Sequence, residues 1–186
     1  MHIPKKGLRA LGIAESYTGR SVSRLAGVVM RKDLRIDGFI FSTVTVGGTD
    51  ATPAILQMIQ KLGRSDINVI LLSGCVIAWF NIINPALIVQ ETGIPVICVT
   101  YEESEGLEGD IRHHFPADAI RISAYENLGE RQRVNLHTHL SVFIRSWGIN
   151  HLDAARLCND FTLEGKIPEP LRVARLCARM LPPLSS

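Results

Sequence analysis

Two apolar segments of this chain end in polar residues that could do chemistry. Residues 8–14 lead into Glu15, and residues 69–72 lead into Ser73. Each segment is typical of a buried strand, and strand ends are the usual place for catalytic groups on an α/β sheet. A magnesium site needs charged oxygen ligands, which a serine does not supply. The metal-binding capacity of these two ends therefore depends on Glu15 and on carboxylates from elsewhere.

A row of arginines lies on the predicted last helix. Arg172, Arg175 and Arg179 are spaced i, i+3 and i+7, opposite an apolar stripe of Val173, Leu176, Cys177 and Met180. Such a basic face is either simply solvated or contacts phosphates without sequence preference. In the second case, binding should weaken with salt.

The sequence contains two pairs of closely spaced histidines. His137 and His139 would face the same side of a strand, which suits zinc, but no third ligand follows at motif spacing. An exposed polar strand edge accounts for them more simply. His113 and His114 lie at a predicted helix end, where the helix dipole favours an imidazolium, and we assign them a structural role.

Composition limits the classes of protein. The 186 residues are 46% apolar and 20% charged, which predicts one domain over residues 1–186 with a sizeable core. The formal charge of +2 provides no global attraction to nucleic acid or membranes. The four cysteines form no C-x-x-C pair and suit a reducing compartment. No signal-peptide core begins the chain, and no apolar run reaches the roughly 20 residues of a membrane helix, so we expect a cytoplasmic protein.

Hydrophobic periodicity and turn residues predict the elements. We expect helices where apolar residues recur at helical spacing between capping residues and glycine or proline. Thr52-Pro53 should cap the first helix, Asn84-Pro85 the second and Ser104 the third. The predicted strands are 8–14, 23–31, 37–46, 67–72, 94–100, 119–123 and 140–145, and the predicted helices are 54–62, 84–93, 104–114, 150–161 and one from 169.

The order of these elements predicts the fold class. Three strands joined by short links form an antiparallel meander, and the later strands are separated by helices and should be parallel. This is the order of an α/β, ribonuclease H-like mixed sheet with helices on both faces. A dinucleotide-binding fold would need a glycine-rich turn after the first strand, and none is present.

Short motifs along nearly the whole chain resemble one family. The most specific is the block Ile-Pro-Glu-Pro-Leu-Arg-Val-Ala at 167–174, and others lie at 11–16, 27–31, 37–38, 50–52, 72–74, 80–81, 92–97 and 114–116. Together they look like the largely archaeal family named endonuclease dU, which is regarded as a relative of endonuclease V among the ribonuclease H-like nucleases.

The resemblance implies magnesium-dependent cleavage of a phosphodiester near a deaminated base in DNA or RNA, an activity of DNA repair. In the fuller family pattern the first strand ends Gly-Ile-Asp-Asp and the fourth ends Asp-Gly. Ala14, Glu15 and Ser73 stand at those three aspartate positions. Glu15 and Asp50 are then the candidate metal ligands and, with Ser73, the candidate catalytic residues. Asn81, Arg172 and Arg175 are the candidate substrate-binding residues.

Structural interpretations remain open for these residues. Glu15 could be a solvated loop carboxylate, Asp50 could favour the N-terminus of the helix that follows it, and Asn81 could satisfy a turn. Three functions follow: a nuclease of the endonuclease V kind, a non-catalytic member of the fold that binds nucleic acid or protein, and an enzyme acting on a small molecule. Loss of activity on Glu15→Gln or Asp50→Asn would indicate the first, and loss of binding on Arg172→Ala with Arg175→Ala the second.

Overall fold

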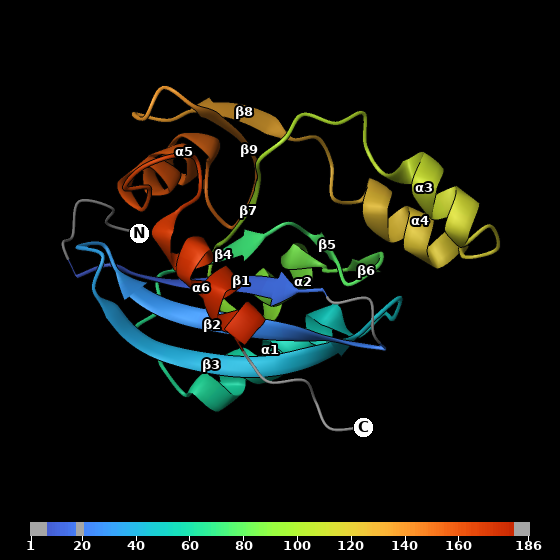
Figure 1. The fold of residues 1–186 in the computed structure, drawn as a ribbon, viewed down its shortest axis with the longest axis horizontal. Helices are drawn as coiled ribbons and strands as arrows, with labels where there is room; N and C mark the ends of the chain where they lie inside the picture. Colours follow the sequence, from blue (N-terminus) through green and yellow to red (C-terminus); the bar gives the residue numbers. More distant parts are fainter. Residues whose placement is uncertain (1–6, 18–20, 181–186) are drawn as a thin grey trace.

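A mixed seven-stranded sheet forms the centre of the computed structural model, which describes residues 7–17 and 21–180 (Figure 1). The strands are β1 (Arg9–Ser16), β2 (Val22–Arg31), β3 (Ile36–Thr45), β4 (Val69–Ser73), β7 (Val96–Thr100), β8 (Gln132–Asn135) and β9 (Ser141–Trp147). They lie in the order β3-β2-β1-β4-β7-β9-β8, and β5 (Val76–Ile77) pairs with β6 (Asn81–Ile82) in a separate hairpin.

Strand directions confirm the predicted mixed sheet up to β7, whereas the prediction of parallel strands was wrong for β8 and β9. Strands β1, β2 and β3 form the antiparallel meander, and β4 is parallel to both β1 and β7. The last two strands are antiparallel to their neighbours. Ile13 is paired with Leu72, so β1 and β4 reach the same edge of the sheet together.

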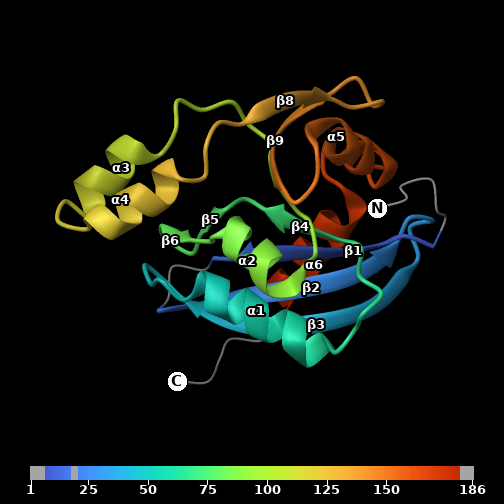
Figure 2. The ribbon, with the colours of Figure 1, turned by 180° about the vertical axis from the view of Figure 1, so that it is seen from behind.

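Helices cover both faces of the sheet (Figures 1 and 2). On one face α1 and α2 pack against Leu11, Ile13 and Leu72, and on the other α5 and α6 pack against Ala10 and Leu71. Helices α3 and α4 pack on each other beside the β5–β6 hairpin. The helices are α1 (Ala51–Leu62), α2 (Pro85–Thr92), α3 (Glu108–His114), α4 (Ala119–Glu126), α5 (His151–Asp160) and α6 (Glu169–Met180).

Capping residues explain where several helices begin and end. Asn84 and Asn150 accept hydrogen bonds from the backbone N–H groups of Leu87 and Asp153, and Gly63 and Gly93 end α1 and α2 in the left-handed conformation. The prediction of a Thr52 cap was wrong: α1 begins at Ala51, and the Thr52 hydroxyl instead accepts from the Asn84 N–H at 2.8 Å. The first N–H group of α1, that of Ala51, donates instead to the Asn81 side chain, which is distant in sequence.

Other predictions were wrong in the second half of the chain. Residues 119–123 lie in helix α4, whose first turn is capped by the Asp118 carboxylate. Helix α3 begins at Glu108 and has no side-chain cap, four residues after the predicted Ser104 start. His137 and His139 lie in the tight connection between β8 and β9, where His139 has φ of 65°, so they do not share a strand face.

The buried face of α6 also differs from the prediction. Leu171, Ala174 and Ala178 face the sheet, whereas Leu176 and Met180 are 47% and 84% exposed. Small side chains let the helix approach β1 closely: a Cβ on Gly12 would lie 2.5 Å from Pro170. The packing distance, and not the most apolar stripe, decides which face of α6 is buried.

The cysteines lie mostly in the core, as their apolar sequence surroundings predicted. Cys75, Cys98 and Cys158 are buried thiols, and Cys177 is half-buried. Burial raises the pKa of Cys158 to about 12, so that thiol stays neutral.

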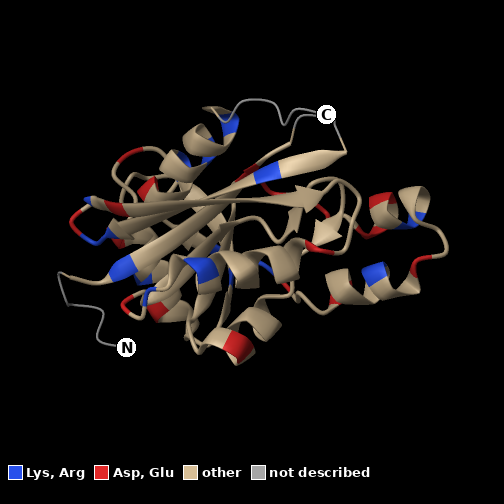
Figure 3. Cartoon of the chain, turned by 90° about the horizontal axis from the view of Figure 1, so that it is seen from below, with Lys and Arg blue, Asp and Glu red and all other residues tan. Residues whose placement is uncertain are grey.

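Acidic and basic residues are interspersed along the chain (Figure 3). Within the described part of the chain, no helix has the length and apolarity to cross a membrane. The predicted absence of a signal peptide concerns residues 1–6, which lie outside the described residues.

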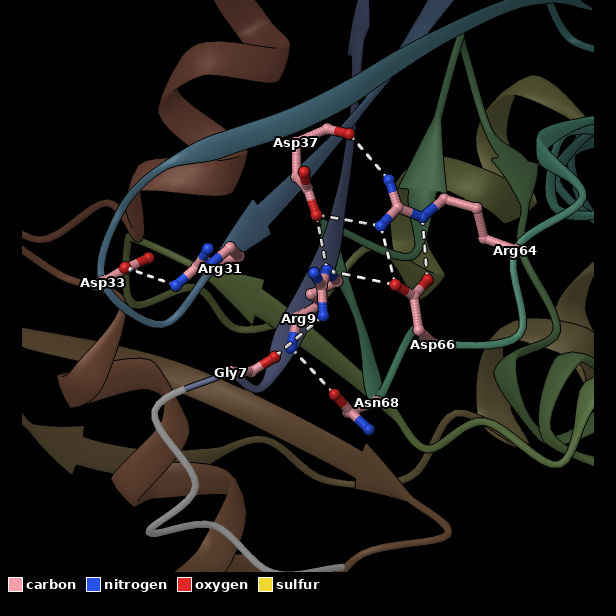
Figure 4. Close-up of polar contacts among 8 residues, drawn as sticks. All are labelled: Gly7, Arg9, Arg31, Asp33, Asp37, Arg64, Asp66 and Asn68. Carbon is pink, nitrogen blue, oxygen red and sulfur yellow. Dashed lines mark hydrogen bonds and ion pairs between the residues drawn. The ribbon is translucent and has the colours of Figure 1, made fainter.

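An ion-pair cluster ties together the start of β1, the start of β3 and the α1–β4 connection (Figure 4). The Arg9 Nε lies 2.5 Å from the Asp37 carboxylate and 3.2 Å from that of Asp66. Arg64 bridges the same two carboxylates at 2.9 and 2.8 Å. Because each carboxylate contacts two guanidinium groups, the cluster holds the end of the sheet remote from Glu15.

This cluster predicts a loss of stability in acid. Hydrogen bonds from Arg64 lower the pKa of Asp66 to about 2, and those from Arg9 and Arg64 lower the pKa of Asp37. A carboxyl group titrates near pH 4 when unfolded, so the stabilisation is complete above about pH 4 and is lost as pH falls through about 2. Between pH 6 and pH 3, the free energy of unfolding measured in urea should decrease less for Asp66→Asn than for the native chain. Equal decreases would contradict this, and high salt should reduce the difference.

Candidate functional site

Ala14 and Ser73 occupy neighbouring positions at the ends of β1 and β4, and both face α6. Ala14 packs against Ala174 of α6, and the Ser73 hydroxyl contacts Arg175. Successive side chains of a strand alternate between faces, so Glu15 points to the opposite face. Its contacts agree, since Glu15 is bound to Ser23 and to the β5–β6 hairpin. The sheet therefore separates Glu15 from Ser73.

Both carboxylate oxygens of Glu15 accept hydrogen bonds from the protein. The Ser23 hydroxyl of β2 donates to Oε2, and the Ala78 N–H donates to Oε1 at 3.2 Å. Ala78 lies in the turn of the β5–β6 hairpin. Glu15 is thus no freely solvated loop residue, because it fastens the hairpin to the end of β1.

Arg175 brings a positive charge to the end of β4. Its Nε and Nη2 donate to the Ser73 Oγ at 3.1 and 2.8 Å, and its guanidinium carbon lies 4.5 Å from the ring centroid of Tyr101. Burial raises the pKa of the Tyr101 hydroxyl to about 12 against the opposing effects of Arg175 and Ser73, so the phenol is neutral at pH 7. The serine and the tyrosine ring together fix the orientation of the guanidinium.

Asp50 stabilises the loop between β3 and α1. Its two oxygens lie 3.1 Å from the Thr45 nitrogen, Oδ2 accepts from the Thr45 hydroxyl at 2.8 Å, and Oδ1 accepts from the Asn81 amide at 2.6 Å. Burial acts to raise the pKa of Asp50, but the hydrogen bonds from Thr45 and Asn81 outweigh it and lower the pKa. Through these four hydrogen bonds the Asp50 carboxylate holds the β3–α1 loop in place.

Asn81 is fully buried and completes the same loop. Its Oδ1 accepts from the Ala51 N–H at 3.0 Å, which satisfies the first turn of α1, and its Nδ2 also donates to the Thr45 carbonyl at 2.9 Å. All of its polar atoms are therefore engaged by the protein. This placement matches the turn-satisfying interpretation of Asn81.

The remaining predicted residues of α6 do not form one solvated face. Arg172 makes a bidentate ion pair with Glu169 of the preceding turn, with a shortest distance of 2.7 Å, and this contact raises the pKa of Arg172. Arg179 is exposed, whereas Arg175 turns toward the sheet. Of the three arginines, Arg175 is the one that reaches the strand ends.

This donor set does not fit a magnesium site. Glu15 and Ser73 point to opposite faces, the oxygens of Asp50 are engaged by Thr45 and Asn81, and Ser73 is occupied by a cationic group. Among residues 7–17 and 21–180, no cluster of three or more histidine, cysteine, aspartate or glutamate residues is placed to hold a metal ion. Magnesium prefers carboxylate oxygens and water, and a neighbouring guanidinium opposes it.

Two residues of this region escaped the sequence analysis. Arg121 is buried in α4 and donates to the backbone carbonyls of Gly47, Gly48 and Phe80. Tyr101, directly after β7, carries the ring beneath Arg175. A lone arginine in the segment 119–123 carries no motif, and only the fold brings Tyr101 beside α6.

Comparison with known proteins identifies the family. The sequence model of Endonuclease dU matches residues 6–182. The chain belongs to the Endonuclease dU family. A UPF0215 protein of Pyrobaculum calidifontis is 39% identical over 173 residues, which cover 90% of this chain and 93% of the relative.

Solved structures confirm the fold of this Endonuclease dU chain. A protein of unknown function from Archaeoglobus fulgidus has a TM-score of 0.82 at 26% identity, covering 92% of this chain and 96% of that chain. Endonuclease V of Ciona intestinalis, crystallised with a DNA containing an inosine, has a TM-score of 0.63 at 14% identity, covering 92% and 84%. The sheet is therefore ribonuclease H-like, as the element order predicted.

Proposed function

We propose that this Endonuclease dU chain binds nucleic acid through its sugar–phosphate backbone and does not depend on magnesium to do so. The observation that carries the proposal is the Arg175 guanidinium, held by Ser73 and Tyr101 at the end of β4. The guanidinium has five N–H donors, and the contacts with Ser73 use two of its three nitrogens. The remaining donors suit the oxygens of a phosphate.

The comparisons support this ligand class. Endonuclease V of Ciona intestinalis shares the fold and was crystallised with DNA, and the Argonaute of Marinitoga piezophila, with a TM-score of 0.54, was crystallised with guide RNA and target DNA. In an α/β sheet, the carboxyl ends of the strands are where ligands bind. A fixed arginine there contributes the positive charge that a metal ion would otherwise supply.

Removing Arg175 should weaken binding without unfolding the chain. We expect Arg175→Ala to raise the Kd for a short DNA or RNA about 10- to 100-fold, because a charge-assisted hydrogen bond is lost. The slope of log Kd against log salt should decrease by about 1. Fluorescence anisotropy at several salt concentrations measures both.

The control is Arg35→Ala, an arginine that is 77% exposed at the β2–β3 turn, at the other end of the sheet. It should leave the Kd nearly unchanged. Arg175→Lys keeps the charge but loses the planar fork and should give an intermediate Kd. Equal Kd values for Arg175→Ala and the native chain would refute the proposal.

The sequence also predicts a magnesium-dependent nuclease with Glu15 and Asp50 as ligands, which the contacts of these two carboxylates do not favour. It is tested with uracil- and hypoxanthine-containing DNA and RNA in magnesium or manganese. We expect no product above the background of Glu15→Gln, because that carboxylate is engaged by Ser23 and Ala78. Product that disappears in Glu15→Gln would establish the nuclease. Glu15→Gln is the sharper variant, since its amide oxygen can still accept from the Ala78 N–H, whereas Asp50→Asn disturbs four hydrogen bonds of the β3–α1 loop.

A further inference from the structure

We propose that Trp79 is a stacking platform for one unpaired base of the bound strand, an inference that rests on the proposed nucleic-acid binding. Trp79 lies at the tip of the β5–β6 hairpin, which follows β4 directly. The Ala78 N–H bonds to Glu15, so the hairpin tip is anchored to the end of β1, adjacent to β4. Arg175 lies at the same end of the sheet but on its α6 face, so a strand whose phosphate reaches Arg175 must cross the ends of β1 and β4 to reach the hairpin.

The backbone that presents Trp79 is unusual. Ala78, Trp79 and Phe80 have φ values of 42°, 58° and 60°, three consecutive left-handed residues without a glycine. This region is disfavoured for residues with a Cβ, and such conformations persist where the surrounding structure enforces them. Backbone strain of this kind is concentrated at functional sites, which makes this turn a candidate for a binding role.

Three contacts enforce the conformation. The Gly47 N–H donates to the Ala78 carbonyl at 2.7 Å, Arg121 donates to the Phe80 carbonyl, and the Ala78 N–H is held by Glu15. The turn is thus fixed by β1, by the β3–α1 loop and by α4 at once. A tryptophan on such a support loses little freedom when a ligand binds.

The indole ring is supported and yet accessible. Its centroid lies 4.8 Å from that of His114, with an interplanar angle of 57°, and 5.3 Å from that of Phe80 in an edge arrangement. The residue nevertheless remains 45% exposed. Aromatic rings backed in this way and open to solvent stack on nucleobases with little sequence preference.

The surroundings favour a base over a protein partner. The indole packs against the rings of Phe80 and His114, lies beside Gly47, and keeps 45% of the residue exposed. Protein hot spots lie within fully desolvated, well-packed patches. A single planar surface at the same end of the sheet as Arg175 fits one nucleotide.

The experiment compares two strands of equal length, one single-stranded DNA with bases and one with abasic residues at its central positions. Fluorescence anisotropy gives the Kd of each. Trp79→Ala should raise the Kd for the base-containing strand about 5- to 100-fold and leave that for the abasic strand unchanged. Arg175→Ala should raise the Kd for both strands. The matched control is Phe39→Ala, an aromatic residue that is 48% exposed on the edge strand β3 and should change neither.

A second variant separates stacking from folding. Trp79→Gly removes the same ring as Trp79→Ala but suits the left-handed backbone, so its thermal midpoint should be higher than that of Trp79→Ala, while it still weakens binding to the base-containing strand. If the Trp79 variants raise the Kd of both strands equally, or of neither, the stacking platform is overturned. A surface that binds protein would also leave both Kd values unchanged. In either case a retained Arg175 dependence leaves the proposed function standing. No binding of the native chain to either strand would overturn both.

Discussion

Replacing Arg121 with leucine should lower the free energy of unfolding by about 3–5 kcal/mol, the range for removing one member of a buried charged network. The arginine side chain is 6% exposed. It donates to the Gly47 and Gly48 carbonyls at 3.0 and 3.1 Å and to the Phe80 carbonyl, it pairs with Asp118 at 3.0 Å, and it lies 4.1 Å over the Phe115 ring. Leucine fills the space but leaves three carbonyl groups without their donor. Urea unfolding at pH 7 measures the loss.

Arg112→Leu on the neighbouring helix α3 is the matched control for this experiment. Arg112 is 55% exposed and pairs with Glu108 one turn away, so its loss should change the stability by less than about 0.5 kcal/mol. Because Arg121 also holds the turn that presents Trp79, Arg121→Leu should weaken binding to single strands with bases. A stability within about 1 kcal/mol of the native chain would show that water replaces the guanidinium donors.

The long elements could be predicted because their signals are local. Apolar residues at helical spacing, followed by Gly63, define α1, and Asn84 and Gly93 bracket α2. The β5–β6 hairpin gave no such signal. Its strands have two residues each, and its turn uses Ala78, Trp79 and Phe80 where glycine or asparagine would mark a turn.

Helix α4 shows the opposite error. Ile120 and Ile122 alternate with polar residues, which is the pattern of a half-buried strand. In the structure Ile120 is 82% exposed and Arg121 is buried. The contacts of Arg121 with distant loops override the local pattern, and no single-sequence argument contains those contacts.

The candidate site could be predicted in its location but not in its geometry. The sequence placed Glu15 and Ser73 at adjoining strand ends, and the pairing of Ile13 with Leu72 agrees. Which face each side chain uses depends on the register between β1 and β4, and a shift by one residue reverses it. The spacing of the arginines in α6 likewise could not show that Arg175 turns toward Ser73.

The neutral residues Ala14 and Ser73 and the cationic Arg175 at the strand ends are physically consistent with each other. Aspartates at positions 14 and 73 would lie on the α6 face, the face that Arg175 occupies. An arginine beside two carboxylates would pair with them and compete with a metal ion. With Ala14 and Ser73 in place, the guanidinium has no carboxylate partner within residues 7–17 and 21–180, and its positive charge is left for an anionic ligand. Neutral residues at positions 14 and 73 and the position of Arg175 therefore belong to one arrangement.

Replacing Gly12 with alanine should cost about 2–3 kcal/mol of stability, as expected for overpacking, and should weaken phosphate binding. The added Cβ would lie 2.5 Å from the Cβ and backbone carbon of Pro170 and 2.7 Å from its oxygen, so α6 must move away from β1 and carry Arg175 with it. Urea unfolding and DNA anisotropy measure the two effects. Gly109→Ala, where a Cβ meets nothing within 4 Å, should leave the stability unchanged or slightly higher. Unchanged binding in a destabilised Gly12→Ala chain would separate Arg175 from the position of α6, and would then contradict the assignment of the phosphate contact to this helix.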